Sequence, residues 1–131
     1  MSSLFTKIIQ GEIPCHRIAE DEQFMAFLDV FPLAMGHVLV IPKKETDYFF
    51  DLSTEELSRI LIFAQPIAHA IAQAFPCRKV GLSVVGLEVP HAHVHLVPMQ
   101  TVNDLNFSQP KLSPSPESLA EAAERIRFFL R

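Results

Sequence analysis

Three of the six histidines in the chain, His91, His93 and His95, alternate with apolar residues. On a β-strand, the side chains at positions i, i+2 and i+4 share one face. A strand over 91–97 would therefore present three imidazoles on one side and small apolar side chains on the other. The apolar side can pack under helices, so we expect the histidine side to be an open face of the sheet or a site on that face.

Three kinds of site fit this pattern. The first is a solvated polar face. The second is a metal site, but His91 and His95 would have backbones roughly 13 Å apart on one strand, so a further ligand such as His37 or Glu88 would be needed. The third is covalent phosphoryl or nucleotidyl transfer, in which a central imidazole attacks phosphorus and its neighbours bind phosphate oxygens and move a proton. The linear spacing favours the third.

The composition limits the class of protein. The 131 residues suit one domain with one core, and the net charge of −4 argues against a broad basic surface for nucleic acid. No apolar run approaches the roughly 20 residues that span a bilayer, and the first residues lack the features of a secretory signal. Cys15 and Cys77 are not paired by their spacing. We therefore expect a reduced, cytoplasmic protein with no nucleic-acid or membrane partner.

The elements that must position the histidines follow from periodicity and capping. Ser53 and Ser115 are good N-caps, and Pro66 is expected to kink the helix that Ser53 begins. We predict strands at 16–20, 23–30, 36–42, 79–85 and 91–97, helices at 54–75 and 116–130, a helical turn at 4–9, and a loop at 99–114. The predicted fold class is α+β: a single domain over 1–131 with an about five-stranded, mostly antiparallel sheet and two main helices on one face.

The stretch HAHVHLV (91–97) resembles the signature of the histidine triad family. The resemblance extends to LFTKIIQGEIP (4–14), which is similar to the family's N-terminal segment, and to AFLDVFPLAMGHVLVIPKKE (26–45), which is similar to its central strand, loop and strand. It implies the histidine triad fold, with 99–131 as a C-terminal loop and helix extension. It also implies a nucleotide hydrolase or transferase that acts at an α-phosphate.

The resemblance also implies roles for individual residues. His93 matches the nucleophile, which forms a nucleotidyl-histidine intermediate, and His91 and His95 match the flanking histidines that orient it and contact phosphate. His37 matches a fourth histidine near the site, and Asp29 matches the carboxylate that binds ribose hydroxyls. The residues that match the apolar surroundings of the base are Phe5, Ile8, Phe27, Val30 and Leu39. Each has a plainer alternative: Asp29 as a turn cap, His37 as a structural hydrogen-bonding group, and the apolar residues as core.

The chain departs from the family pattern before the triad. Leu87 replaces a polar amide, Glu88 replaces a small hydroxyl residue, and Pro90 replaces an aromatic residue. Glu88 could reject highly charged polyphosphates, could transfer a proton, or could be a solvated loop carboxylate. Ser3 and Thr6 stand where some members carry a zinc-binding cysteine pair, so we expect no structural zinc and no cofactor.

The substrates implied are purine nucleotides or their conjugates: nucleoside phosphoramidates, dinucleoside polyphosphates or related adenylylated compounds. The alternative, motivated by the altered 86–90 run, is a nucleotide-binding or regulatory module with weak or no turnover. The resemblance further implies a homodimer. The predicted helix at 54–75 and the strand at 79–85 are apolar enough to cover an interface as well as a core.

Overall fold

The computed structural model describes residues 2–130, and its centre is one five-stranded antiparallel sheet. The strands lie in the order β1-β2-β3-β5-β4, and every neighbouring pair is antiparallel. Their bounds are β1 (Arg17–Glu20), β2 (Phe24–Leu28), β3 (Val38–Pro42), β4 (Lys79–Ser83) and β5 (Val94–Met99). The α+β fold class is confirmed.

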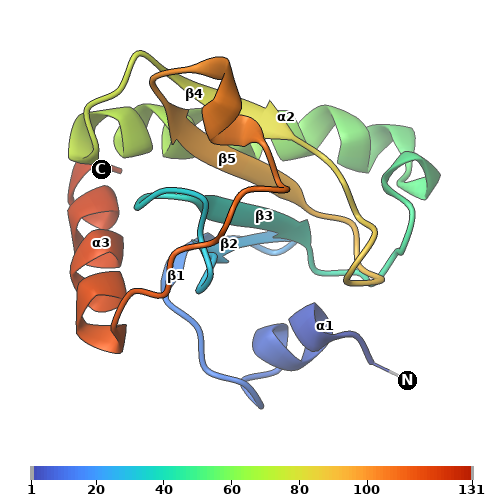
Figure 1. The fold of residues 1–131 in the computed structure, drawn as a ribbon. Coiled ribbons are helices and arrows are strands. Elements are labelled where there is room, and N and C mark those ends of the chain that lie inside the picture. The colour runs from blue at the N-terminus through green and yellow to red at the C-terminus, as the bar shows by residue number, and fades with distance from the viewer. Residues whose placement is uncertain (1, 131) are drawn as a thin grey trace.

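Three α-helices surround this sheet: α1 (Leu4–Ile9), α2 (Thr54–Ala74) and α3 (Pro116–Phe129). Two short 3₁₀ turns are also present, η1 (Phe49–Asp51) and η2 (Val102–Leu105). Figure 1 shows the long α2 behind the sheet, α3 along its left side and α1 apart from both, below β3. No helix of residues 2–130 is long and apolar enough to cross a membrane.

The sheet has a hydrophobic core on each face. Residues of α2 and α3, such as Ile67 and Ile126, pack with Ala26 and Val40 of the strands in the larger core. The smaller core contains Phe5 of α1, packed with the strand residues that point the opposite way: Met25, Phe27, Leu39 and Ile41. Because successive strand residues face opposite sides, β2 and β3 supply both cores. Helices therefore cover both faces rather than one, and the small α1 encloses the second face.

The helix starts follow the predicted capping chemistry. The Ser53 hydroxyl accepts a hydrogen bond from the Glu56 amide and the Glu56 carboxylate accepts one from the Ser53 amide, which completes a capping box. Ser115 caps α3 in the same manner, by accepting from the Ser118 amide. The helix α2 continues through Pro66, which is exposed.

The strand predicted to carry the triad differs from its prediction at both ends, and of the three histidines it contains only His95. It begins at Val94 rather than at residue 91, because the amide of Ala92 donates to the Thr46 carbonyl (2.7 Å) instead of joining the ladder. It continues to Met99, which pairs with Lys79 of β4. Of the two alternatives for the histidine side, the open face was wrong, because all three triad side chains are buried, His91 completely and His93 at 6% exposure. His93 and His95 line a cavity instead, which agrees with a site on that face.

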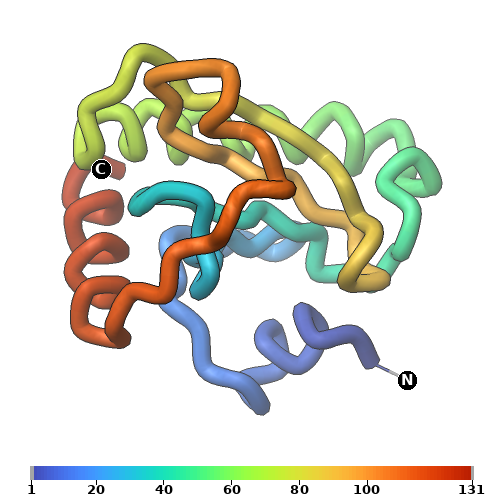
Figure 2. Tube along the Cα trace, in the orientation of Figure 1, coloured from blue at the N-terminus to red at the C-terminus, as the bar shows by residue number. Residues whose placement is uncertain are grey.

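The chain between β5 and α3 passes across the front of the sheet. In the tube of Figure 2 this segment leaves η2, descends past β3 and reaches the beginning of α3. Its path brings residues distant in the sequence from the triad to the same side of the molecule as α1.

Candidate active site

His93 is held in one tautomer by the main chain. Its Nδ1 lies 2.7 Å from the carbonyl oxygen of His91. A carbonyl only accepts hydrogen bonds, so Nδ1 of His93 carries a proton, and in the neutral ring Nε2 keeps its lone pair. An unprotonated imidazole nitrogen beside a cavity is the form that can attack phosphorus.

A chain of hydrogen bonds fixes the opposite arrangement in His95. The amide of Leu33 donates to Nδ1 of His37 (3.0 Å), so His37 carries its proton on Nε2. That proton is donated to Nδ1 of His95 (3.0 Å), and the proton of His95 is therefore on its own Nε2. His95, which lines the cavity, thus supplies a hydrogen-bond donor, whereas His93 supplies a lone pair.

His37 and His95 are neutral at neutral pH. Burial, with a smaller contribution from the charge of Lys111, lowers the pKa of His37 to about 4. Burial likewise lowers the pKa of His95 to about 3, with a smaller contribution from His37. The pair can therefore donate and accept hydrogen bonds without carrying charge.

His91 has a different position from the other two triad members. Its Nε2 donates to the Pro42 carbonyl oxygen (2.7 Å), and its Nδ1 accepts from the Ser3 hydroxyl (2.8 Å). Burial lowers the pKa of His91. Its side chain does not line the cavity, so it reaches the site through its carbonyl, which orients His93.

Asp29 lies between β2 and β3 and lines the cavity. Its Oδ1 accepts from the Phe31 amide (2.9 Å), which is the turn-capping contact, and its Oδ2 lies 3.7 Å from Nε2 of His37. Burial raises the pKa of Asp29 above its usual range. One oxygen therefore shapes the turn while the other remains available to a ligand.

A cavity of about 430 Å³ adjoins the histidines. This volume lies within the range of sites for small organic ligands. Phe5 links the apolar and polar parts of the wall, because its ring lies edge-on to the rings of both Phe27 and His93, with ring centroids 5.5 Å and 5.0 Å apart. Every residue predicted to contact the base lines this cavity, and so do Glu88 and two of the triad histidines. The eight residues are Phe5, Ile8, Phe27, Val30, Leu39, Glu88, His93 and His95. His37 and His91 lie behind that wall.

Asp29, His37 and His95 are also close enough to hold a metal ion, with ligand atoms within 4.8 Å of one another. However, Nε2 of His37 would have to offer a lone pair, and the Leu33 amide already requires the proton to be on that nitrogen. These three residues therefore fit a hydrogen-bonded chain better than a set of metal ligands.

Among the lining residues that the sequence did not predict, two come from the segment after β5. Phe107 packs on His95 with ring centroids 4.6 Å apart, and Lys111 lines the cavity beside Asp29. Both belong to the segment predicted only as a loop. The available signal was that they are the one aromatic residue and the one cation of 99–114.

An antiparallel sheet with alternating imidazoles beside an apolar cavity defines a protein of the histidine triad class. The family model of the HIT domain matches residues 10–102, and the chain belongs to the HIT family. Membership of this family places the chain in the nucleotide hydrolase and transferase superfamily.

Curated relatives and solved structures agree with this assignment. The chain is 33% identical to the adenosine 5′-monophosphoramidase hnt1 of Schizosaccharomyces pombe over 128 residues, covering 96% of each chain. It is similar to the structure of a HIT-like protein from Bartonella henselae, with a TM-score of 0.86 and 32% identity, and the match covers 98% of this chain and 96% of the other. It is also similar to the structure of a zinc-bound histidine triad family protein from Mycobacterium smegmatis, with a TM-score of 0.84 and 30% identity, and the match covers 99% of this chain and 94% of the other.

Proposed function

We propose that this protein hydrolyses nucleotide conjugates at the α-phosphate through a covalent intermediate on Nε2 of His93. The observation that carries this proposal is the tautomer of His93, whose Nδ1–H is bound by the His91 carbonyl. The similarity to an adenosine 5′-monophosphoramidase makes nucleoside phosphoramidates the first substrate class to test.

The reaction has two displacements at phosphorus. In the first, the Nε2 lone pair of His93 forms a bond to phosphorus while the bond to the leaving group breaks, and the departing group takes up a proton from solvent. In the second, water attacks the same phosphorus, loses a proton to solvent, and returns the electron pair to His93. His95 donates a hydrogen bond to the phosphate oxygen on which charge accumulates in both steps.

The remainder of the cavity suits the nucleoside. The apolar residues around Phe5 and Phe27 offer a surface for a purine ring, and Oδ2 of Asp29 can accept hydrogen bonds from ribose hydroxyls. The roles of His37 and His91 are then positioning roles, because their contacts are to other residues of the site.

Trapping the intermediate tests the proposal. The protein is mixed with adenosine phosphoramidate, quenched in acid-free denaturant, digested and analysed by mass spectrometry. We expect a nucleotidyl adduct on the peptide that contains His93, and no adduct with His93→Ala. An adduct on a different residue, or turnover in the variant, would exclude this mechanism.

The alternative is a nucleotide-binding or regulatory module with weak or no turnover. It is favoured by the 86–90 loop, where Leu87 is 88% exposed and the Glu88 carboxylate lines the cavity. Binding of adenosine 5′-monophosphate with neither adduct nor turnover would support this second function.

A further inference from the structure

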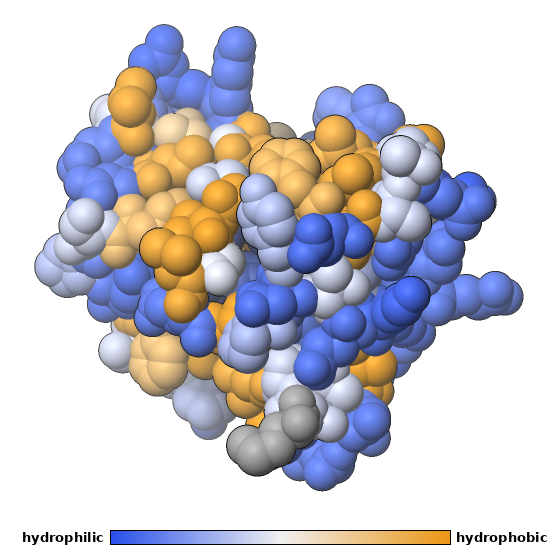
Figure 3. All heavy atoms as spheres, turned by 90° about the vertical axis from the view of Figure 1, so that its right-hand side faces the viewer, coloured by the Kyte–Doolittle hydropathy of each residue, from blue (hydrophilic) through white to orange (hydrophobic). Residues whose placement is uncertain are grey.

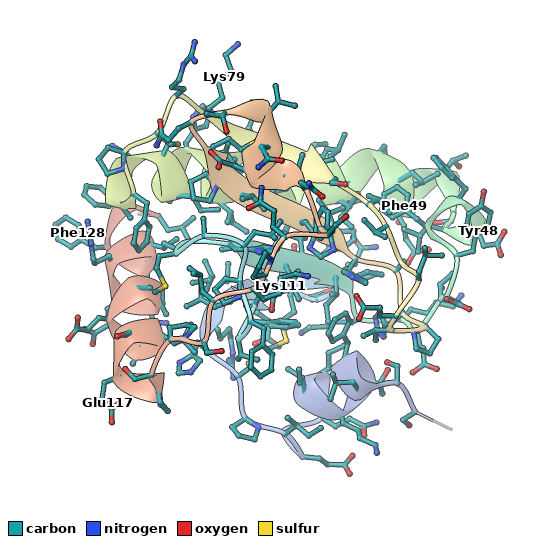
Figure 4. The ribbon with its side chains drawn as sticks, in the orientation of Figure 1. Tyr48, Phe49, Lys79, Lys111, Glu117 and Phe128 are labelled. Atoms are coloured by element: carbon teal, nitrogen blue, oxygen red, sulfur yellow. The ribbon has the colours of Figure 1, made fainter. Side chains whose placement is uncertain are left out.

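Residues 106–112, here called the strap, bring a cation to the site from outside the matched HIT region of 10–102. Figure 4 shows Lys111 on this segment, in front of β3 and above α1. We propose that Lys111 binds the α-phosphate and is the residue that lets the site distinguish a nucleotide from a nucleoside. This inference rests on the proposed function, because it assigns a residue to the phosphate of that substrate.

The strap is docked on the site at several points. The Leu112 amide donates to the Pro32 carbonyl (2.9 Å), which ties the strap to the turn between β2 and β3. The Phe107 ring packs on His95 and, more distantly, on His37, with ring centroids 6.4 Å apart for the second pair. The Lys111 ammonium donates to the Phe107 carbonyl (3.0 Å), so its side chain is directed back along the strap towards the histidines.

The site needs a cation that its histidines do not supply. His37 and His95 are neutral at neutral pH, and the His91 side chain is directed away from the cavity. Among the cavity-lining residues that the structure describes, Lys111 is the one Lys or Arg, and Glu88 adds a carboxylate at the rim. A phosphate anion at the site would therefore find its positive charge on the strap.

Lys111 has capacity to bind that anion. Within residues 2–130 it makes no ion pair, and one of its three ammonium donors is used by the Phe107 carbonyl. Its charge is close enough to the histidines to depress the pKa of both His37 and His95.

Calorimetric binding of adenosine and adenosine 5′-monophosphate tests the inference. The variants are Lys111→Met, which keeps the length and removes the charge, Lys111→Arg, which keeps the charge, and Lys44→Met as a control at an exposed lysine outside the cavity. We expect Lys111→Met to weaken monophosphate binding about tenfold or more while adenosine binding changes less than about twofold. Lys111→Arg and Lys44→Met should bind both ligands much as the wild type does.

Three results would overturn the inference, and they are distinguishable. If Lys111→Met binds the monophosphate as tightly as the wild type, Lys111 is not the phosphate ligand, while the proposed function stands on wild-type turnover. If Lys111→Met weakens the binding of adenosine and of the monophosphate by the same factor, Lys111 acts only on the shape of the cavity. If the wild type neither prefers the monophosphate over adenosine nor hydrolyses the phosphoramidate, the proposed function fails and this inference fails with it.

Discussion

Each histidine of the cluster holds its proton on the nitrogen that a neighbouring group dictates. A carbonyl determines the proton position in His93, and a backbone amide determines it in His37 and, through that ring, in His95. Four side chains of one type therefore have different chemical roles. The direction of the hydrogen bonds, rather than the number of imidazoles, separates the proposed nucleophile from the proposed donor.

The first prediction concerns His93→Ala. We expect kcat to fall by several orders of magnitude, as is typical when a nucleophile is removed. His93 is buried against Phe5, contrary to the open position expected from the sequence, so a stability loss of about 1–3 kcal/mol should accompany it. Kinetics and urea unfolding measure the two effects, with His69→Ala on the exposed face of α2 as the control. Near-normal rates in His93→Ala would contradict a covalent role.

A second prediction at this scale concerns Glu88, whose exposed carboxylate lines the cavity. We expect Glu88→Ser to raise kcat/KM for dinucleoside polyphosphates relative to phosphoramidates, because a negative charge near the phosphates is removed. Rates for both substrate types across the range from mildly acidic to neutral pH provide the measurement. Lower turnover on every substrate with a shifted pH profile would indicate proton transfer instead, and unchanged kinetics would leave Glu88 as a solvated loop residue.

At the scale of elements, the position of α1 depends on a polar cluster at its first turn. The Ser3 hydroxyl caps the helix by accepting from the Thr6 amide and also donates to His91. The Glu45 carboxylate accepts from both the Ser3 amide (2.7 Å) and the Thr6 hydroxyl (2.6 Å). This cluster joins α1, which carries Phe5 to the cavity, to the end of β3.

The cluster leads to a third prediction, for Ser3→Ala. We expect the free energy of unfolding to fall by about 1–3 kcal/mol, because the cap disappears and the buried Nδ1 of His91 keeps only its longer contact with the Thr6 hydroxyl (3.4 Å). KM for the nucleotide substrate should also rise, since α1 forms one wall of the cavity. Ser115→Ala is the matched control, because it removes an equivalent cap on α3 that touches no histidine. Equal KM values in both variants would show that α1 does not depend on this cluster.

Capping and alternation allowed the sequence to predict the elements, and the family resemblance located most of the cavity wall. Ser53 and Ser115 act locally, so their helices begin where predicted. The start of β5 was mispredicted, since residues 91 and 92 bond to partners outside the ladder, such as Thr46. Lys111 was missed because only the folded path of the strap brings it near Asp29. The tautomers could not be predicted either: the partners of His93 and His37 lie within four residues, but the turns that bring them together are not evident from the sequence, and the His37–His95 bond joins residues 58 positions apart.

For the whole molecule, the neutral buried histidines make stability depend on pH. The pKa of His37 is lowered to about 4 and that of His95 to about 3, so the unfolded chain binds protons below about pH 6.5 that the folded protein does not. Stability should therefore fall as the pH decreases from about 6.5 towards 4, by about 2 kcal/mol for each such histidine at pH 5. The pKa of Glu45 is lowered to about 2, chiefly by the Thr6 hydroxyl, and its contribution is lost at still lower pH.

Urea unfolding at several pH values measures this fourth prediction. His37→Asn should show a shallower loss between pH 7 and 5 than the wild type, although its stability at pH 7 is lower, and His69→Ala should follow the wild type. An equal dependence on pH in wild type and His37→Asn would contradict the assignment of the effect to the buried pair.

The fifth prediction is a homodimer, which we propose from the family resemblance and from exposed apolar surface. Strand β4 is an edge of the sheet with Leu82 47% exposed, and Ile62 of α2 is 69% exposed. Figure 3 shows hydrophobic side chains gathered on the side of the molecule where α2 begins. Light scattering should give about twice the 14.7 kDa chain mass, and Ile62→Glu should reduce it. Phe129→Glu on α3 is the control, and a wild-type mass of one chain would refute the dimer.

The amide of Leu33, which donates to His37, also decides which nitrogen of His95 carries the proton. That amide is presented by the turn 29–37, whose shape depends on Gly36 at φ +97°, where a Cβ atom would lie 2.8 Å from the Phe75 ring. If the turn rotated this one peptide unit away, the His37 proton could move to Nδ1, and His95 would then present a lone pair to the cavity instead of an N–H. The hydrogen bond between His37 and His95 would then run in the opposite direction, although every imidazole would stay in place. Two chains with identical histidines can thus differ in reactivity through a backbone torsion that no comparison of side chains records.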